Sequence, residues 1–187
     1  MKTLLLTIAL LTAPFILSAQ LGLGIKAGAN FANLNTDSYN TSSITSFHVG
    51  LYANINFSES WSVTPEVLWT DQGAELDNGD KFETDYIAVP LMLRWRIIDL
   101  ISIEAGPQFN FLTKAESGGV DIKDDITDPS YNAAFGALIH LPLGLNGGVR
   151  YIVGLTDLSK DEDVELKDQT FQVYIGWTIL GAKKGSN

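Results

Sequence analysis

A two-residue period of apolar and polar side chains runs through most of the chain and constrains its fold more than any other feature. In residues 100–111, for example, Ile101 and Ile103 alternate with Ser102 and Glu104. Successive side chains of a strand point to opposite faces of a sheet, so this pattern predicts strands. Alternation alone does not say which face points inward, because soluble sheets and membrane barrels expose opposite faces.

Eight segments share this alternation, with odd-numbered residues apolar and even-numbered residues polar or small. They span residues 22–34, 46–57, 61–72, 84–95, 100–111, 131–141, 145–155 and 170–180. Each is about 10 to 12 residues long, which suits a tilted strand that crosses a bilayer, whereas soluble strands are mostly about 5 or 6 residues long. Segment length therefore favours a membrane-spanning sheet.

Long polar loops and short turns alternate strictly between these segments. The expected loops are residues 35–45, 73–83, 113–130 and 159–168, and the expected turns are residues 58–60, 96–99 and 142–144. This layout is typical of bacterial outer-membrane barrels, whose turns lie in the periplasm and whose long loops lie outside. We therefore predict an all-β fold, an eight-stranded antiparallel up-and-down transmembrane β-barrel over residues 20–187 with both termini in the periplasm.

The first residues predict a secretory signal peptide. Lys2 is followed by an apolar run of about 14 residues and then by Ser18 and Ala19. Cleavage after Ala19 would make residues 1–19 the signal peptide. The alternative is an uncleaved membrane anchor, but the run is shorter than the roughly 18 to 20 residues that a spanning helix needs.

Aromatic residues of the odd-numbered set lie mostly at segment ends, as in the girdles of a lipid-facing barrel. Those at the loop end are Phe31, Phe47, Trp69, Phe111, Tyr131 and Phe171, and those nearer the turn end are Phe57, Trp61, Trp95 and Trp177. The even-numbered set is rich in Gly, Asn, Gln and Tyr, which suits a narrow lumen filled by side chains. We expect the apolar face to point into lipid; the alternative is a soluble secreted barrel or sandwich.

Five charged residues recur at even positions inside the segments: Lys26, Glu66, Arg94, Glu104 and Arg150. An unpaired charge in a low-dielectric lumen is costly, so these residues should pair. We expect a Glu66–Arg94–Glu104 cluster that Lys26 and Arg150 reach from the far wall. Because about eight strands enclose an interior that side chains just fill, we expect a structural plug, with a gated ion path as the alternative.

Three prolines, Pro65, Pro90 and Pro107, fall inside consecutive segments. Each removes a backbone donor that hydrocarbon cannot replace. We expect bulges or lumen water beside them, with the three defects side by side.

Several motifs resemble the PorT-type outer-membrane β-barrel family. They are GIKAGANFANL, VTPEVLW, YIAVPLMLRW, IEAGPQFNFL and GGVRYIVGLTDL, after a signal peptide that ends in SAQ. The resemblance covers almost the whole mature chain and implies that the fold tolerates prolines within strands. The founding member of that family takes part in protein secretion. The tail LGAKKGSN departs from barrels that end on an aromatic residue.

Composition excludes several classes of function. The 187-residue chain has no cysteine, which excludes disulfides, thiolate metal sites and a catalytic thiol. Its 12 basic and 22 acidic residues give a net charge of -10, so a nucleic-acid partner is not expected. The segment GLGIKAG lacks the glycine spacing of a phosphate-binding loop and is not followed by a helix.

A Ser/His/Asp site at the loop-end rim is conceivable but not expected. The residues that could form it are His48, Ser42, Ser43, Ser46, Asp71 and Asp85. A single lumen histidine is more often a hydrogen-bonding filler, and His140 lies at the opposite end. We therefore expect no enzyme, no cofactor and no transition-metal site.

The expected loops are strongly acidic and could bind calcium or bridge it to lipopolysaccharide phosphates. Their acids are Glu75, Asp77, Asp80, Glu83, Asp121, Asp124, Asp125, Asp128, Asp161, Glu162, Asp163, Glu165 and Asp168. None of the segments has the spacing of an EF-hand, so solvated acidic loops are the simpler interpretation.

We therefore expect a structural or binding scaffold that displays acidic loops outside the cell. The alternatives are a small pore or secretion-associated barrel, and a soluble secreted barrel or rim-site enzyme. The expected surroundings are outer-membrane lipid and lipopolysaccharide, with an extracellular or secretion-machinery protein as a partner. We expect the barrel to be a monomer.

Overall fold

Nearly all of the described residues lie in strands. The computed structural model describes residues 20–35, 41–76, 81–117, 120–123, 127–156 and 167–181. The strands are β1 (Gln20–Asn35), β2 (Thr41–Asn56), β3 (Trp61–Leu76), β4 (Lys81–Ile98), β5 (Ile101–Ser117), β6 (Val120–Asp121), β7 (Ser130–His140), β8 (Leu145–Gly154) and β9 (Lys167–Gly181). The short 3-10 helix η2 (Pro142–Gly144) connects β7 to β8.

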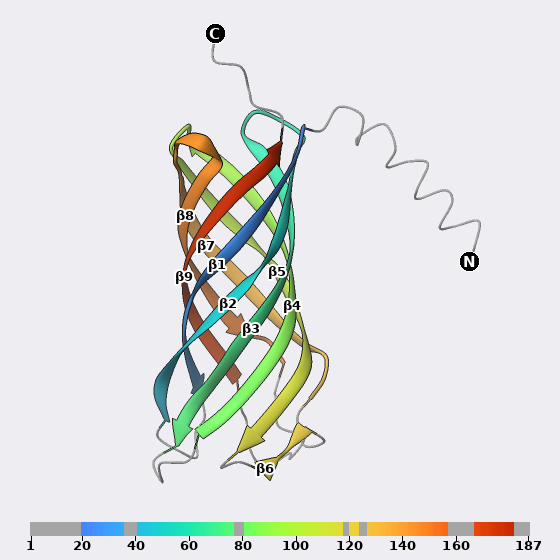
Figure 1. Cartoon of the computed structure of the whole chain (residues 1–187), viewed down its shortest axis with the longest axis vertical. Helices are drawn as coiled ribbons and strands as arrows, with labels where there is room; N and C mark the ends of the chain where they lie inside the picture. Colours follow the sequence, from blue (N-terminus) through green and yellow to red (C-terminus); the bar gives the residue numbers. More distant parts are fainter. Residues whose placement is uncertain are drawn as a thin grey trace, which may run out of the picture.

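Eight of the strands close into a barrel (Figure 1). Each pairs antiparallel with its neighbours in the chain, β4 pairs with β5, and β1 closes the ring by pairing with β9. The two-residue strand β6 pairs only with β5 and stands outside the ring. A closed ring leaves no strand edge unpaired. The predicted eight-stranded antiparallel up-and-down barrel is confirmed.

The start of β1 and the end of β9 lie at one end of the barrel (Figure 1). We call this the turn end, because it also carries the short connections at residues 57–60, 99–100 and 142–144. The opposite end, which we call the loop end, carries the connections at residues 36–40, 77–80, 118–129 and 155–166. Within the described part of the chain, no helix is long and apolar enough to span a membrane.

The predicted strand boundaries are wrong at the loop end. Residues 41–45 and 73–76, expected in loops, are strand, and Ser42 pairs with Glu75. Residues 113–117 extend β5, which then pairs with β6 inside the expected loop of residues 113–130. At the turn end, β4 continues to residue 98. Backbone pairing does not require apolar side chains, so strands continue past the point where the apolar alternation stops.

The alternation itself is confirmed, with odd-numbered residues outside and even-numbered residues inside. On β2, for example, Leu51 is 63% exposed whereas Tyr52 is 3% exposed. The rule fails near the loop end of β5, where the register against β4 shifts by one residue. Leu112 is opposite Tyr86 and Lys114 is opposite Asp85, so Thr113 between them is an extra residue on β5. Beyond it Ala115 is fully buried and Lys114 is exposed, so the two faces exchange parity.

The prolines lie side by side, as predicted, but the expected bulges are absent. Pro65 is opposite Leu91, and Pro90 is opposite Gln108, the neighbour of Pro107. Pairing is interrupted beside the prolines, yet it resumes in the same register. A β-carbon at Gly106 would collide with the carbonyl oxygen of Leu91, so a glycine lets β4 and β5 approach closely where the ladder is interrupted. The expectation of lumen water stays a prediction.

A charge on the outward face tests its contact with hydrocarbon. Leu51 lies between Ile25 on β1 and Val67 on β3, midway between the two sets of aromatic residues. We expect Leu51→Arg to lower the free energy of unfolding by about 2 to 4 kcal/mol, because an arginine at the bilayer midplane is poorly solvated. Urea titration of the barrel in lipid vesicles measures this change.

The matched control is Leu143→Arg in the turn between β7 and β8, where the side chain is 85% exposed. At this end of the barrel the same substitution should cost about 1 kcal/mol or less. Equal costs at the two positions would contradict a lipid-facing wall.

Candidate functional site

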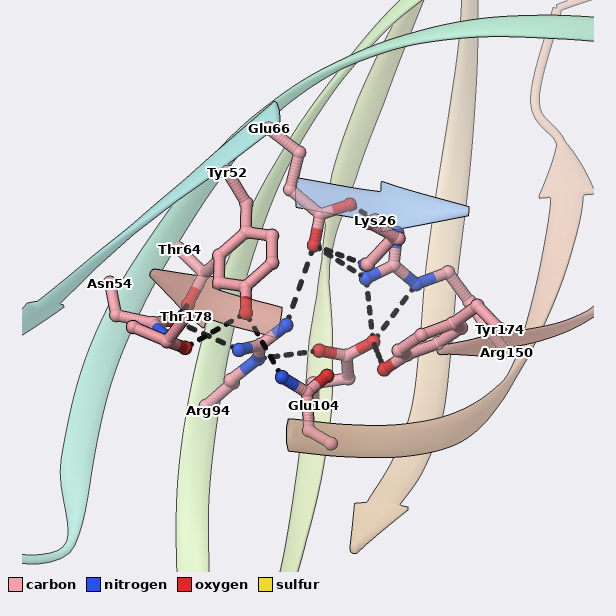
Figure 2. A network of polar contacts seen from close by, with 11 residues as sticks. Lys26, Tyr52, Asn54, Thr64, Glu66, Arg94, Glu104, Arg150, Tyr174 and Thr178 are labelled. Carbon is pink, nitrogen blue, oxygen red and sulfur yellow. Dashed lines mark hydrogen bonds and ion pairs between the residues drawn. The ribbon is translucent and has the colours of Figure 1, made fainter. Parts of the chain in front are cut away.

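An ionic network crosses the barrel interior (Figure 2). It is made by the five charged residues that the sequence singled out, and each is at most 4% exposed. They come from β1, β3, β4, β5 and β8, since each occupies an even, inward-facing position of its strand. Closure of the barrel brings together residues that lie as far as 124 positions apart in the chain, Lys26 and Arg150.

Glu66 is held from two sides. Lys26 donates from Nζ to Oε1 of Glu66 at 2.7 Å. Arg150 donates to both carboxylate oxygens of Glu66, from Nη1 and Nη2, each at 2.9 Å. This two-pronged contact matches the planar guanidinium to the planar carboxylate, which is the strongest geometry for such a pair.

Glu104 accepts hydrogen bonds from three residues. Arg150 donates from Nε at 2.9 Å and from Nη2 at 2.6 Å. Arg94 donates from Nε at 2.7 Å, and the hydroxyl of Tyr174 donates at 3.0 Å. Arg150 therefore bridges the two carboxylates, and the network has its centre at Arg150.

Arg94 lies at the turn side of the network. Its Nη2 reaches Glu66 at 3.4 Å, and its Nη1 donates to Oδ1 of Asn54 at 2.9 Å. The structure thus brings Glu66, Arg94 and Glu104 together with Lys26 and Arg150, and it places Arg94 at the edge of the cluster.

Two tyrosines complete the network, although the sequence interpretation did not single them out. The ring of Tyr174 faces Nζ of Lys26 at 4.0 Å and the guanidinium of Arg150 at 5.5 Å. The hydroxyl of Tyr52 lies 2.8 Å from Oγ1 of Thr178 and accepts a hydrogen bond from Asn146 at 3.0 Å. Both tyrosines are at even positions, so the two-residue period already placed them on the inner face.

The network contains three cations and two carboxylates, all buried. Removing charges from water is expensive, and the pairing offsets this cost only where hydrogen bonds satisfy each group. The contacts above satisfy both carboxylates several times. One positive charge remains without a matching carboxylate inside the network.

The histidine at the loop side of the lumen pairs with an amide. His48 is 1% exposed, and its Nδ1 lies 2.7 Å from Oδ1 of Asn30. The hydroxyl of Ser46 donates to the backbone carbonyl of Asp71. Asp71 and Asp85 are opposite each other on β3 and β4. The side chains of Ser42 and Ser43 lie outside the described residues.

These contacts do not form the serine–histidine hydrogen bond that a nucleophilic site needs. His140 lies near the turn end, where its Nε2 is 2.7 Å from the hydroxyl of Ser102. Among the described residues, no group of three or more His, Asp or Glu side chains could hold a metal ion.

The ten aromatic residues predicted to lie at the lipid interface are on the outer surface. Trp69 is half-buried, and the other nine are exposed: Phe31, Phe47, Phe57, Trp61, Trp95, Phe111, Tyr131, Phe171 and Trp177. Several pack against each other across strands, and the rings of Trp61 and Trp95 stack with centroids 5.7 Å apart. Nε1 of Trp177 donates to the carbonyl of Leu143 at 3.1 Å.

Most of the loop acids lie outside the described residues. These are Asp77, Asp80, Asp124, Asp125, Asp161, Glu162, Asp163 and Glu165. For Glu75, Glu83, Asp121 and Asp168 only the strand backbone is described. Oδ1 of Asp128 accepts a hydrogen bond from the backbone N–H of Leu112 at 2.9 Å, which ties the connection before β7 to β5.

An apolar outer wall, exposed aromatic residues and a polar, filled interior in a closed antiparallel ring define an integral outer-membrane β-barrel. Comparison with protein families agrees. The model of the outer membrane protein beta-barrel domain matches residues 14–160, and the chain belongs to this family. No curated protein matches the sequence.

Solved structures with a similar fold are outer-membrane proteins of low sequence identity. Neisserial surface protein A has a TM-score of 0.59 and 11% identity, over 84% of this chain and 97% of that one. Ail of Yersinia pestis, in complex with the heparin analogue sucrose octasulfate, has a TM-score of 0.52 and 16% identity, over 84% and 97%. OprG of Pseudomonas aeruginosa has a TM-score of 0.51 and 10% identity, over 85% and 93%. At such identities the likeness concerns the fold.

Because the network has more cations than carboxylates, neutralising Glu66 should destabilise the barrel more than neutralising its partner Lys26. Glu66→Gln leaves three buried cations against one carboxylate, and we expect it to lower the free energy of unfolding by about 3 to 5 kcal/mol. Lys26→Gln leaves two cations against two carboxylates, and Arg150 still holds Glu66, so we expect a cost of about 1 to 2 kcal/mol. Urea titration in lipid vesicles compares the two variants, and an equal or larger cost for Lys26→Gln would refute the charge argument.

Proposed function

We propose that this barrel is a non-conducting structural and binding scaffold that displays acidic loops on the cell surface. The observation that carries the proposal is the ionic network, which fills the lumen with side chains that are at most 4% exposed. An ion that crossed the barrel would have to break several charge-assisted hydrogen bonds in a low-dielectric interior. The barrel wall then anchors the protein in the membrane, and partner molecules bind at the two ends of the barrel.

The loop end is the surface that we expect to meet partners. Its acids repel polyanions, so we do not expect it to bind a sulfated ligand such as the heparin analogue in the Ail complex. Acidic loops suit a basic protein surface, or lipopolysaccharide phosphates that divalent cations bridge to the loops. The proposed partners are therefore lipopolysaccharide around the rim and an extracellular or secretion-machinery protein on the loops.

The strand motifs that resemble the PorT-type family support a finer, PorT-type assignment and, with it, a secretion-associated role as the alternative. VTPEVLW and YIAVPLMLRW contribute Glu66 and Arg94 to the network, and IEAGPQFNFL contributes Glu104. The motifs that carry the resemblance are thus the motifs that fill the lumen. We assign no catalytic step to the loop-end rim, where the hydroxyl of Ser46 donates to the backbone carbonyl of Asp71.

The proposed orientation places both termini and the short turns in the periplasm, after removal of residues 1–19 as a signal peptide. Antiparallel strands in an even number return the chain to the side where it began. The loop end, with β6 (Val120–Asp121), then lies outside the cell. We expect a monomer, because the closed ring offers no strand edge for pairing.

Single-channel conductance distinguishes the proposed scaffold function from the alternative, a small pore. The purified native barrel should give no stable single-channel currents in a planar lipid bilayer, because the ionic network blocks the lumen. The positive control is a pore-forming protein from the same outer membrane, prepared in the same detergent. Regular, stable openings of the native protein would overturn the plugged-lumen proposal.

Cysteine labelling in intact cells tests the orientation, since the chain has no cysteine of its own. Val120 at the loop end is 65% exposed, and Ser60 in a short turn is also exposed. A membrane-impermeant maleimide should label Val120→Cys in intact cells and should label Ser60→Cys only after the outer membrane is permeabilised. The opposite pattern would invert the proposed orientation.

A further inference from the structure

A cavity of about 920 Å³ opens at the turn end of the barrel. Its lining includes Arg94, which belongs to the ionic network, and the turn residues of the mouth, such as Ser58 and Pro142. The cavity therefore extends from the mouth to the turn side of the network. We call it the turn-end vestibule.

Basic and hydrogen-bonding side chains line this vestibule. Arg94 and Arg96 lie on β4, Ser102 is opposite Arg96 on β5, and His140 lies 2.7 Å from the hydroxyl of Ser102. Among the described lining residues, Glu59 is the one carboxylate, and it is exposed in the turn at the mouth. The lining thus carries two arginines against one carboxylate.

The numbers of positive and negative groups in the lumen also favour an anion at the vestibule. Inside the described barrel, the three network cations face two carboxylates, those of Glu66 and Glu104, so one positive charge is uncompensated. Half-buried Arg96 adds a positive charge at the mouth, where Glu59 also lies, although the whole chain has a net charge of -10. An uncompensated charge in a low-dielectric interior is costly, so a negative charge at the vestibule would be stabilised.

Arg94 has donors left for such a charge. A guanidinium has five N–H groups. Three of its bonds go to Glu104, Asn54 and Glu66. The remaining N–H groups belong to Nη1 and Nη2, and guanidinium groups bind oxyanions through pairs of such donors.

We propose that the turn-end vestibule binds a phosphate oxyanion, held by Arg94 and Arg96 with Ser102 and His140 beside it. A phosphate monoester carries about 1.5 to 2 negative charges near pH 7, and Arg94 and Arg96 offer it two positive charges. Trp61 and Trp177, two aromatic residues of the outer wall, also line the cavity. The vestibule thus lies at the depth where lipid headgroups meet water, and the phosphate comes either from solution or from a lipid headgroup.

Isothermal titration of the purified full-length barrel in a maltoside detergent with inorganic phosphate tests the site. Phosphate should bind saturably, and chloride at the same ionic strength should not. Arg96→Gln should weaken phosphate binding by about tenfold or more, whereas Arg96→Lys, which keeps the charge, should lose less. The barrel fold of each variant is verified by heat-modifiable gel migration.

The matched control is Lys114→Gln, which removes one positive charge at the loop end, where Lys114 pairs with Glu116 at 3.0 Å. It should leave phosphate affinity unchanged. Equal weakening by Arg96→Gln and Lys114→Gln would show non-specific attraction and overturn the proposal.

A second titration with short-chain phosphatidic acid distinguishes the two sources. If phosphatidic acid binds with the same dependence on Arg96 and inorganic phosphate does not, the result supports a lipid headgroup as the ligand. If inorganic phosphate binds, the result supports a soluble ligand. Saturable binding of neither would overturn the proposal.

Discussion

Complete backbone pairing in hydrocarbon is the constraint on which the rest of this structure depends. A lipid-facing strand has no water to replace a lost partner, so the sheet must close, and β1 meets β9 to close it. The interrupted ladder beside Pro65, Pro90 and Pro107 is the exception. There the register is kept, and Gly106 allows the backbones of β4 and β5 to lie close together.

Closure also creates the environment that makes the ionic network strong. Within the ring, Arg150 reaches Glu66 and Glu104 in a space from which water is largely excluded, where charge-assisted hydrogen bonds gain strength and unpaired charges become costly. The same layer of side chains closes the lumen and leaves a surplus of positive charge next to the vestibule. One arrangement thus underlies the proposed scaffold and the proposed anion site.

Charge is distributed unequally along the barrel. The chain is acidic overall, and its acidic residues are concentrated in and beside the connections at the loop end. The described lumen, in contrast, carries more cations than carboxylates. If the loops lie outside the cell, the acidic end meets external partners and the basic vestibule opens to the periplasm. The two ends would then select ligands of opposite charge without any change in the wall between them.

The sequence alone determined the eight barrel strands, the two faces of each strand and the five charged residues of the lumen, because these follow from a two-residue period that is local to each strand. The aromatic residues at the strand ends then indicated which face points into lipid. It did not determine where strands end, since pairing continues beyond the apolar pattern, nor the parity change at Thr113. It also did not identify Arg150 as the centre of the network or Asn30 as the partner of His48. Those contacts cross the lumen between strands far apart in the chain, and only the register and closure of the whole ring bring them together.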